Sequence, residues 1–384
     1  MKPEAELLLA CVRMDANGIR RALRNPIHWE SLIELADAHA VTALVYSALQ
    51  DAASVPAFAM SELSGQFFIT AARCLLLTSE LHGLMRLFES AGIRAVPFKG
   101  PVLSSMIYGN PAMRAFDDLD ILVRRQDVSC ARELLRSQGY GLRSDGGDHQ
   151  ERTRFHWNSQ MTFVRADGLV ELDVHWDILP RHFPFTPPTD ELMRNLQPAR
   201  IGGEQFMTLV AEDLLLYLCA HGAKHVWQRL AWICDLAGLI RTHSGLDWAA
   251  IVARSAGSER MLRVALILAI DVAGAKLPTD VHRWIERDAV ARAIASEVQQ
   301  RLIGSLEPLG TRRVLSFNIR LTRFPWRKVR YRLGLAMLPS ESDWSAIRLP
   351  SALALLYYPL RIVRLAAKYT LRRCTGPRAA PDMS

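Results

Sequence analysis

The fold is decided by the stretch from Phe98-Lys99-Gly100-Pro101 to Asp118-Leu119-Asp120-Ile121-Leu122-Val123. The apolar run 93–98 predicts a short buried strand that ends at Lys99-Gly100. Pro101 then suits the first position of a helix, where its missing N–H leaves no hydrogen bond unmade. The first-turn amides of such a helix have no partner within the helix, so they can hold a phosphate. The stretch therefore predicts a strand, a tight turn and a helix that faces a phosphate.

Two carboxylates follow on the next predicted strand, 118–123. Residues two apart in a strand lie on the same face, so Asp118 and Asp120 are expected to project side by side. Adjacent carboxylates repel each other unless a cation or a proton lies between them. Mg²⁺ takes oxygen ligands of this kind together with the phosphates of a substrate. The pair therefore predicts a metal site.

A predicted hairpin supplies a third acid. Residues 155–165 alternate like a strand, a turn follows, and residues 169–176 form the returning strand. On the returning strand Glu171, Asp173 and His175 share one face, so the period alone does not choose among them. We favour Asp173 as the third ligand, because it lies mid-strand and its side chain is shorter than that of Glu171.

Four features together resemble the nucleotidyltransferase superfamily with the polymerase-beta-like fold. They are Lys99-Gly100, Arg114, Asp118-Leu119-Asp120 and Asp173-Val174-His175-Trp176. More narrowly, they are similar to a bacterial family of largely uncharacterised nucleotidyltransferases. The resemblance implies an α+β fold, in which a small mixed β-sheet core is flanked by N-terminal and C-terminal helical regions.

The resemblance also implies a reaction. It is the Mg²⁺-dependent transfer of a nucleoside monophosphate from a nucleoside triphosphate, with ATP expected, to an unidentified acceptor, with release of pyrophosphate. Two Mg²⁺ ions held close together would stabilise both the attacking and the leaving oxygen. The implied metal ligands are Asp118, Asp120 and Asp173, and the implied phosphate contacts are Lys99, Gly100 and Arg114.

Three other interpretations stay open. The superfamily's usual Gly-Ser on the first turn is Lys99-Gly100 here, which also suits a non-catalytic binding or assembly protein that keeps the fold. An RNA-acting nucleotidyltransferase would use the basic C-terminal region. However, no RNA-binding motif accompanies that charge, so nucleic acid is not the expected partner. In a purely structural interpretation, Asp118 caps a strand, Asp120 pairs with Arg114, and Asp173 is solvated.

A helical run after residue 205 carries polar side chains that are expected to line the substrate cleft. With His175 of the hairpin, they are His221, Lys224, His225 and Arg229. His221 and His225 are four residues apart on one helix face, a spacing that can hold zinc, but no third ligand is near in sequence. In a structural alternative, His221 and Asp235 form hydrogen bonds between packed helices.

Charge is unevenly distributed along the 384 residues. The net charge is +8, whereas residues 312–373 hold fourteen lysines and arginines against two acids, a net charge of +12. The segment 353–373 is basic and amphipathic, so peripheral contact with an anionic membrane is one interpretation. We favour the other, in which its apolar face docks on the protein and its arginines stay in water.

The cysteines and the N-terminus indicate the compartment. Six cysteines lie far apart without a C-x-x-C motif, and the first residues do not have the pattern of a signal peptide. We therefore expect a cytoplasmic protein. The expected organisation is an N-terminal helical region (1–90), the catalytic core (91–205), a helical domain (206–305), a basic helical region (306–373) and a disordered tail (374–384).

Overall fold

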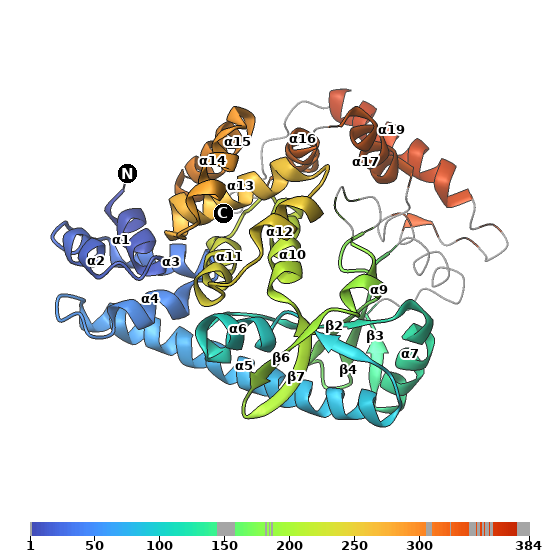
Figure 1. Cartoon of the computed structure of the whole chain (residues 1–384), viewed down its shortest axis with the longest axis horizontal. Helices are drawn as coiled ribbons and strands as arrows, with labels where there is room; N and C mark the ends of the chain where they lie inside the picture. Colours follow the sequence, from blue (N-terminus) through green and yellow to red (C-terminus); the bar gives the residue numbers. More distant parts are fainter. Residues whose placement is uncertain are drawn as a thin grey trace, which may run out of the picture.

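The structure is a computed structural model of the whole chain (Figure 1). It describes residues 2–143, 158–180, 187–304, 309–322, 324–337 and 356–374, together with the single positions 183, 185, 343, 346, 347, 349 and 353. Residues 155–157 of the predicted hairpin and residues 375–384 of the predicted tail lie outside the described residues.

The N-terminal region is helical, as predicted. Its helices are α1 (Pro3–Val12), α2 (Ala16–Ala22), α3 (Trp29–Ala38), α4 (Thr42–Leu49) and α5 (Ala57–Ser90). With 34 residues, α5 is about 50 Å long. Its first half buries Leu63 among the N-terminal helices, and its second half buries Leu81 and Phe88 against the sheet. This one helix therefore joins the two hydrophobic cores of the molecule.

A five-stranded mixed sheet forms the centre of the core region. Its strands are β1 (Ala95–Pro97), β2 (Asp118–Val123), β3 (Tyr140–Leu142), β4 (Gln160–Arg165) and β5 (Glu171–His175). The spatial order is β1-β2-β5-β4-β3, with β2 and β5 parallel and the other neighbours antiparallel. The predicted α+β class with a small mixed sheet is thus confirmed, and β2 has the predicted bounds.

The two faces of β2 have different environments. Leu119, Ile121 and Val123 are fully buried in the core that includes the second half of α5 and the helix α7 (Val128–Ser137). Leu122, on the opposite face, belongs to the core that includes α6 (Pro101–Tyr108) and α10 (Ala211–Lys224). Because Asp118 and Asp120 share the face of Leu122, the fold places both acids on the side of α6 and α10.

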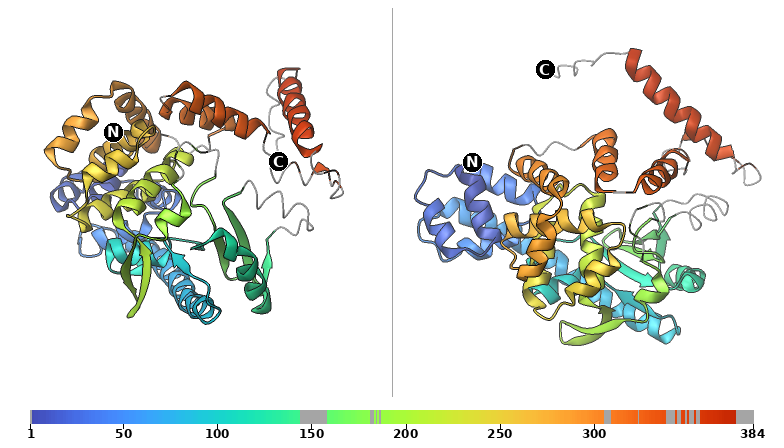
Figure 2. Two further views of the ribbon diagram at one scale, coloured as in Figure 1. Left: turned by 45° about the vertical axis from the view of Figure 1, so that its right-hand side comes forward. Right: turned by 45° about the horizontal axis from the view of Figure 1, so that its top comes forward.

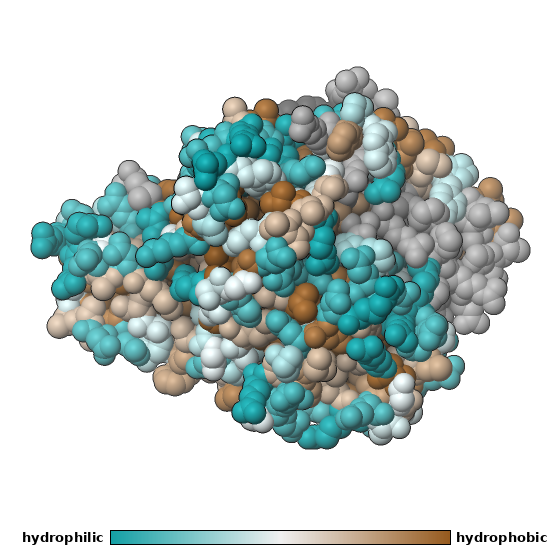
Figure 3. Space-filling model, in the orientation of Figure 1, coloured by the Kyte–Doolittle hydropathy of each residue, from teal (hydrophilic) through white to brown (hydrophobic). Residues whose placement is uncertain are grey.

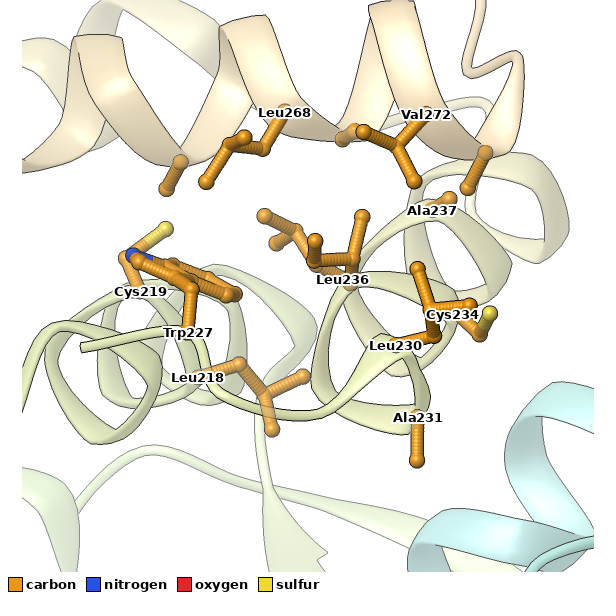
Figure 4. Close-up of a cluster of buried hydrophobic side chains, with 14 of the residues drawn as sticks. Leu218, Cys219, Trp227, Leu230, Ala231, Cys234, Leu236, Ala237, Leu268 and Val272 are labelled. Atoms are coloured by element: carbon orange, nitrogen blue, oxygen red, sulfur yellow. The ribbon is translucent and has the colours of Figure 1, made fainter. Parts of the chain in front are cut away.

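Helices return after the sheet. They are α10, α11 (Leu230–Thr242), α12 (Trp248–Arg254), α13 (Glu259–Ala273), α14 (Thr279–Glu286) and α15 (Ala289–Gly304). The predicted helical run through residue 236 is broken at Val226 and Trp227, both of which have left-handed backbone angles. Figure 4 shows the Trp227 ring packed with Leu236 and Leu268, between α10, α11 and α13. A Cβ on Gly222 would lie 2.4 Å from this ring, so the helix needs glycine there.

One hairpin was not predicted from the sequence. Strands β6 (Leu196–Ile201) and β7 (Glu204–Leu209) pair antiparallel around Gly202 and Gly203, which both have positive φ. Thr208 Oγ1 donates a hydrogen bond to the carbonyl of Pro97 at 2.7 Å, which fastens the hairpin to β1. The short elements that remain are η1 (Pro111–Met113), η2 (Arg125–Asp127) and α9 (Thr189–Leu192).

Three further helices carry the basic excess: α16 (Thr311–Leu321), α17 (Pro325–Met337) and α19 (Tyr357–Cys374). In Figure 2 they lie at one end of the molecule, away from α1 and α2. Pro359 lies in the first turn of α19, where a missing N–H is tolerated. No helix in the described part of the chain combines the length and the apolar character that crossing a bilayer requires.

Candidate active site

The parallel register of β2 and β5 brings the predicted acids together. Asp120 pairs with Asp173, and Asp118 pairs with Glu171. His175 lies two residues beyond Asp173 and therefore on the same face. The side chains of Asp120, Asp173 and His175 are buried, and one ligand atom from each lies within 4.8 Å of the others. Two strands far apart in sequence thus build one cluster.

Each acid of the cluster is held by neighbouring side chains. The Lys99 ammonium donates to Asp120 Oδ1 at 2.8 Å, and His175 Nε2 lies 3.0 Å from the same oxygen. Thr162 Oγ1 donates to Asp173 Oδ1 at 2.5 Å. The Gln160 amide donates to the other oxygen of Asp173. The neighbouring strand β4 therefore fixes Asp173, while the turn before α6 and the end of β5 fix Asp120.

The Lys99–Asp120 pair is charged on both sides. Burial by itself would lower the pKa of Lys99, but the charge and hydrogen bond of Asp120, together with Tyr217 and Asp118, outweigh burial and raise that pKa above its usual range. Burial by itself would raise the pKa of Asp120, but the Lys99 ammonium and the hydrogen bond from His175 hold it well below its usual range. Within the cluster, Lys99 is therefore the counter-ion of Asp120.

Two polar atoms of the cluster are buried without a hydrogen-bond partner among the described residues. They are Asp120 Oδ2 and His175 Nδ1. A buried carboxylate oxygen with no donor is costly, and a bound cation would remove the cost. Carboxylate oxygens from two strands are also the donors that Mg²⁺ and Mn²⁺ prefer. The residues present therefore fit a divalent metal.

Asp118 lies at the start of β2 and is partly buried. Burial, together with repulsion from Asp120, raises the pKa of Asp118 to about 6. The predicted repulsion between the two acids is therefore present in the folded chain. Asp118 lies outside the buried group of three, so its part in metal binding stays a prediction.

Comparison with known proteins identifies the family. A family model described as "Uncharacterised nucleotidyltransferase" matches residues 25–274, well over half of the chain. The chain belongs to this nucleotidyltransferase family. No curated protein matches it. The family match runs from the N-terminal helices to the end of α13 and stops before the basic helices α16, α17 and α19.

The first turn of this nucleotidyltransferase requires glycine. Gly100 has a φ of 53°, and a Cβ built on it would meet the carbonyl oxygen of Asp118 at 3.4 Å. Side chains rarely tolerate such backbone angles, so Gly100 lets the turn lie against β2. Pro101 opens α6, as predicted. The contacts of Lys99 and Gly100 with phosphate stay predictions.

Arg114 forms its ion pair with Asp235 and not with Asp120. Its Nε donates to both carboxylate oxygens of Asp235 on α11, each at 2.9 Å, and both side chains are buried. Burial raises the pKa of Asp235, although Arg114 opposes this shift. The structural alternatives predicted that Asp120 pairs with Arg114 and that His221 pairs with Asp235. The structure instead pairs Arg114 with Asp235. Contact of Arg114 with a phosphate stays a prediction.

One face of α10 lies beside Lys99. The Lys99 ammonium is 5.9 Å from the centroid of the Tyr217 ring, and the Tyr217 hydroxyl is 3.3 Å from His221 Nδ1. The rings of His221 and His225 are 4.8 Å apart, and both contact Trp232 of α11. The predicted cleft residues on this helix are thus neighbours of the acidic cluster. Arg229, which precedes α11, is exposed.

The histidines on this face are held neutral. Burial, followed by the charge of Lys99, lowers the pKa of His221 well below its usual value. Burial and the charge of Lys224 lower the pKa of His225 to about 4. Lys224 itself has a lowered pKa because of burial and Lys99. Zinc at His221 and His225 gains no support, because the group of three metal-ligating side chains found in the described residues is Asp120, Asp173 and His175.

Several neighbours of the site were missed from the sequence. They are Gln160, Thr162, Tyr217 and Trp232. Thr162 pairs with Asp173 across the hairpin, so the register of a correctly drawn hairpin would have found it. Tyr217 lies four residues before His221, one helical turn along the same face. No helical or strand period links Trp232 to the site, because its place depends on the turn at residues 226 and 227.

Proposed function

We propose that this protein transfers a nucleoside monophosphate from a nucleoside triphosphate, ATP in the first instance, to an acceptor, in a Mg²⁺-dependent reaction that releases pyrophosphate. One observation carries the proposal. The parallel register sets Asp120 opposite Asp173 and leaves Asp120 Oδ2 buried without a partner among the described residues. Membership of a nucleotidyltransferase family gives the reaction class.

The metal ligands in this proposal are Asp118, Asp120 and Asp173. When bound, Mg²⁺ neutralises the charge that develops on the phosphate oxygens and on the leaving pyrophosphate. Thr162 and Gln160 hold Asp173 in one orientation, which keeps the ligand geometry rigid. The carboxylate of Asp173 is therefore already oriented before a substrate binds.

In this proposal, the cationic side chains beside the acids bind the phosphates of the nucleotide. Lys99 can donate to a phosphate oxygen from its place next to Asp120, and the first-turn amides of α6 point out of the helix start. Lys224 is a second ammonium near these acids. Burial lowers its pKa, and it makes no ion pair with the residues that the structure describes. An anionic triphosphate would supply the missing partner.

The proposed transfer forms one bond, breaks one bond and moves one proton. A hydroxyl oxygen of the acceptor attacks the α-phosphorus, the bond from that phosphorus to the pyrophosphate oxygen breaks, and the hydroxyl proton passes to a carboxylate. Asp118 suits this proton transfer, because it lies beside Asp120 at the start of β2 and is less buried than Asp120.

The test uses position-specific labels. The protein is incubated with cell extract, Mg²⁺ and each nucleoside triphosphate, labelled at either the α- or the γ-phosphate. We expect label on an acceptor from the α-position and none from the γ-position, and no transfer by Asp120→Asn. Equal transfer by Asp120→Asn, or transfer of the γ-label, would overturn the proposal.

A second candidate is a nucleotide-binding protein without turnover. The specific observation in its favour is the Lys99–Asp120 ion pair, in which an ammonium already neutralises a proposed metal ligand. In that case nucleotide binding is measurable by calorimetry, no label is transferred from any triphosphate, and Asp120→Asn leaves the biological role of the protein intact.

A further inference from the structure

The basic C-terminal helices also expose apolar side chains. Eighteen large apolar residues are exposed in the described part of the chain, and ten of them lie between residues 324 and 363. Apolar residues are visible at the surface in the upper right of Figure 3, where α17 and α19 lie. The same segment carries the net charge of +12 found between residues 312 and 373. Apolar exposure and positive charge therefore coincide.

Helix α17 turns an apolar stripe outward. Trp326, Val329 and Leu333 follow the 3.6-residue period and are 57%, 52% and 52% exposed. Arg330 and Arg332, which lie next to them in the chain, are exposed too. Tyr331, on the opposite side of the helix, is buried in the core of the protein and contacts Phe183. The helix thus docks through Tyr331 and leaves its mixed apolar and basic face uncovered.

Two arginines of helix α19, Arg361 and Arg364, differ from the expectation that the arginines of this segment stay in water. Arg361 and Arg364 bind the carboxylate of Asp343, which is buried, with the Arg364 Nε at 2.7 Å. Ile362 and Val363, between those arginines, are 51% and 64% exposed. Arg361 and Arg364 thus point toward Asp343, whereas the apolar side chains between them face outward. Helices α17 and α19 contact each other.

We propose that the outer face of α17, with α19 beside it, binds the surface of an anionic lipid bilayer. The exposed apolar side chains would enter the boundary between headgroups and acyl chains, while Arg330 and Arg332 of α17 contact lipid phosphates. Charge complementarity selects this occupant. A second copy would bring an equally basic surface against the first, and RNA offers no apolar layer for valine, leucine and isoleucine.

This inference does not rest on the proposed transfer reaction, and its test measures binding alone. The full-length protein is sedimented with vesicles of phosphatidylglycerol and phosphatidylcholine, and with vesicles of phosphatidylcholine only. We expect binding to the anionic vesicles, weaker binding at high salt, and at least about tenfold weaker binding to the neutral vesicles. Absence of binding to the anionic vesicles would overturn the proposal.

Matched variants test the surface itself. Val329→Asp/Leu333→Asp and Arg330→Gln/Arg332→Gln should each weaken binding to anionic vesicles by about tenfold or more. The apolar control is Ile69→Asp/Leu75→Asp on α5, where both side chains are exposed. The charge control is Arg283→Gln/Arg287→Gln, at two exposed positions in and after α14. Both controls should bind like wild type, and all variants should keep the wild-type melting temperature.

Three results would contradict the assignment. Unchanged vesicle binding by both α17 variants would move the contact to another surface. RNA binding that is lost in the arginine variant, without vesicle binding by wild type, would make RNA the partner. A dimer in analytical ultracentrifugation that Val329→Asp/Leu333→Asp dissociates, again without vesicle binding, would make the face an interface between copies.

Discussion

Asp120 and Asp173 lie directly opposite each other on the parallel strands β2 and β5. Asp173 takes hydrogen bonds from Thr162 and Gln160 on its two oxygens, whereas Asp120 contacts Lys99 and His175 through Oδ1 and keeps Oδ2 without a partner among the described residues. The two carboxylates therefore differ. One is fully positioned by protein donors, and the other retains a free ligand atom.

Asp173→Asn should abolish label transfer, with a loss of at least about 100-fold, while the fold stays intact. The amide keeps the size of the side chain but removes one anionic ligand. Glu171→Gln should retain partial activity, because Glu171 pairs with Asp118 at the start of β2 and binds the exposed Arg143. Transfer rates of both variants check this. An essential Glu171 beside a dispensable Asp173 would move the third ligand by two residues.

Mg²⁺ with ATP should raise the melting temperature of wild type, because ligands that bind the folded state stabilise it. A concentration one hundred times the dissociation constant gives about 2.7 kcal/mol, or several degrees. Melting curves of Asp118→Ala with and without Mg²⁺ and ATP should coincide. Wild-type curves that already coincide would count against the metal site.

Without metal, the contribution of Asp118 to the free energy of unfolding should fall as the pH rises from about 4 to about 6. Its folded-state pKa of about 6 exceeds the usual 3.8, so the folded state binds this proton more tightly than the unfolded state does. Asp118→Asn should therefore be more stable than wild type above about pH 7, by on the order of 1–2 kcal/mol. Urea unfolding in the presence of a chelator measures the difference.

The difference between Asp118→Asn and wild type should vanish near pH 4, where wild type is protonated as well. Asp117→Asn is the matched control, because the neighbouring Asp117 is exposed. It should follow the wild-type curve at every pH. A wild type that is the more stable protein above pH 7 would show that repulsion at Asp118 is relieved within the chain.

Lys99→Ala should weaken triphosphate binding by about 10- to 100-fold, the range expected for a lost charge-assisted hydrogen bond. Binding of the monophosphate should change less, because it lacks the β- and γ-phosphates. Calorimetric titration with both nucleotides tests this, with the exposed Lys276→Ala as control. Equal losses for the two nucleotides would assign Lys99 to structure.

Arg114→Met and Asp235→Leu should each destabilise the protein by about 3–5 kcal/mol, because each leaves one charge buried without its partner. The double variant should recover much of that loss. Urea unfolding gives the three free energies, and triphosphate binding by the double variant tests the predicted phosphate contact. Unchanged binding would leave Arg114 with a purely structural role.

Local patterns were enough to predict the elements that carry the site. The apolar run 121–123 after the acids predicted β2, the period of two put Asp118 and Asp120 on one face, and the Gly100-Pro101 pair predicted the turn and the start of α6. The helical period placed His221 and His225 on one face of α10. These features depend on neighbours within one strand or one helical turn, and such neighbours are close in the sequence itself.

Tertiary structure decided which of these side chains meet. The strand period alone did not distinguish the three polar residues on β5, and the parallel register with β2 set Asp173 opposite Asp120. The tertiary structure also pairs Arg114 with Asp235, which is 121 residues away in the sequence. It pairs Arg361 and Arg364 of α19 with Asp343. A buried charge must find a partner wherever the packing provides one. Such pairings depend on how distant elements pack, and no local period in the sequence encodes that.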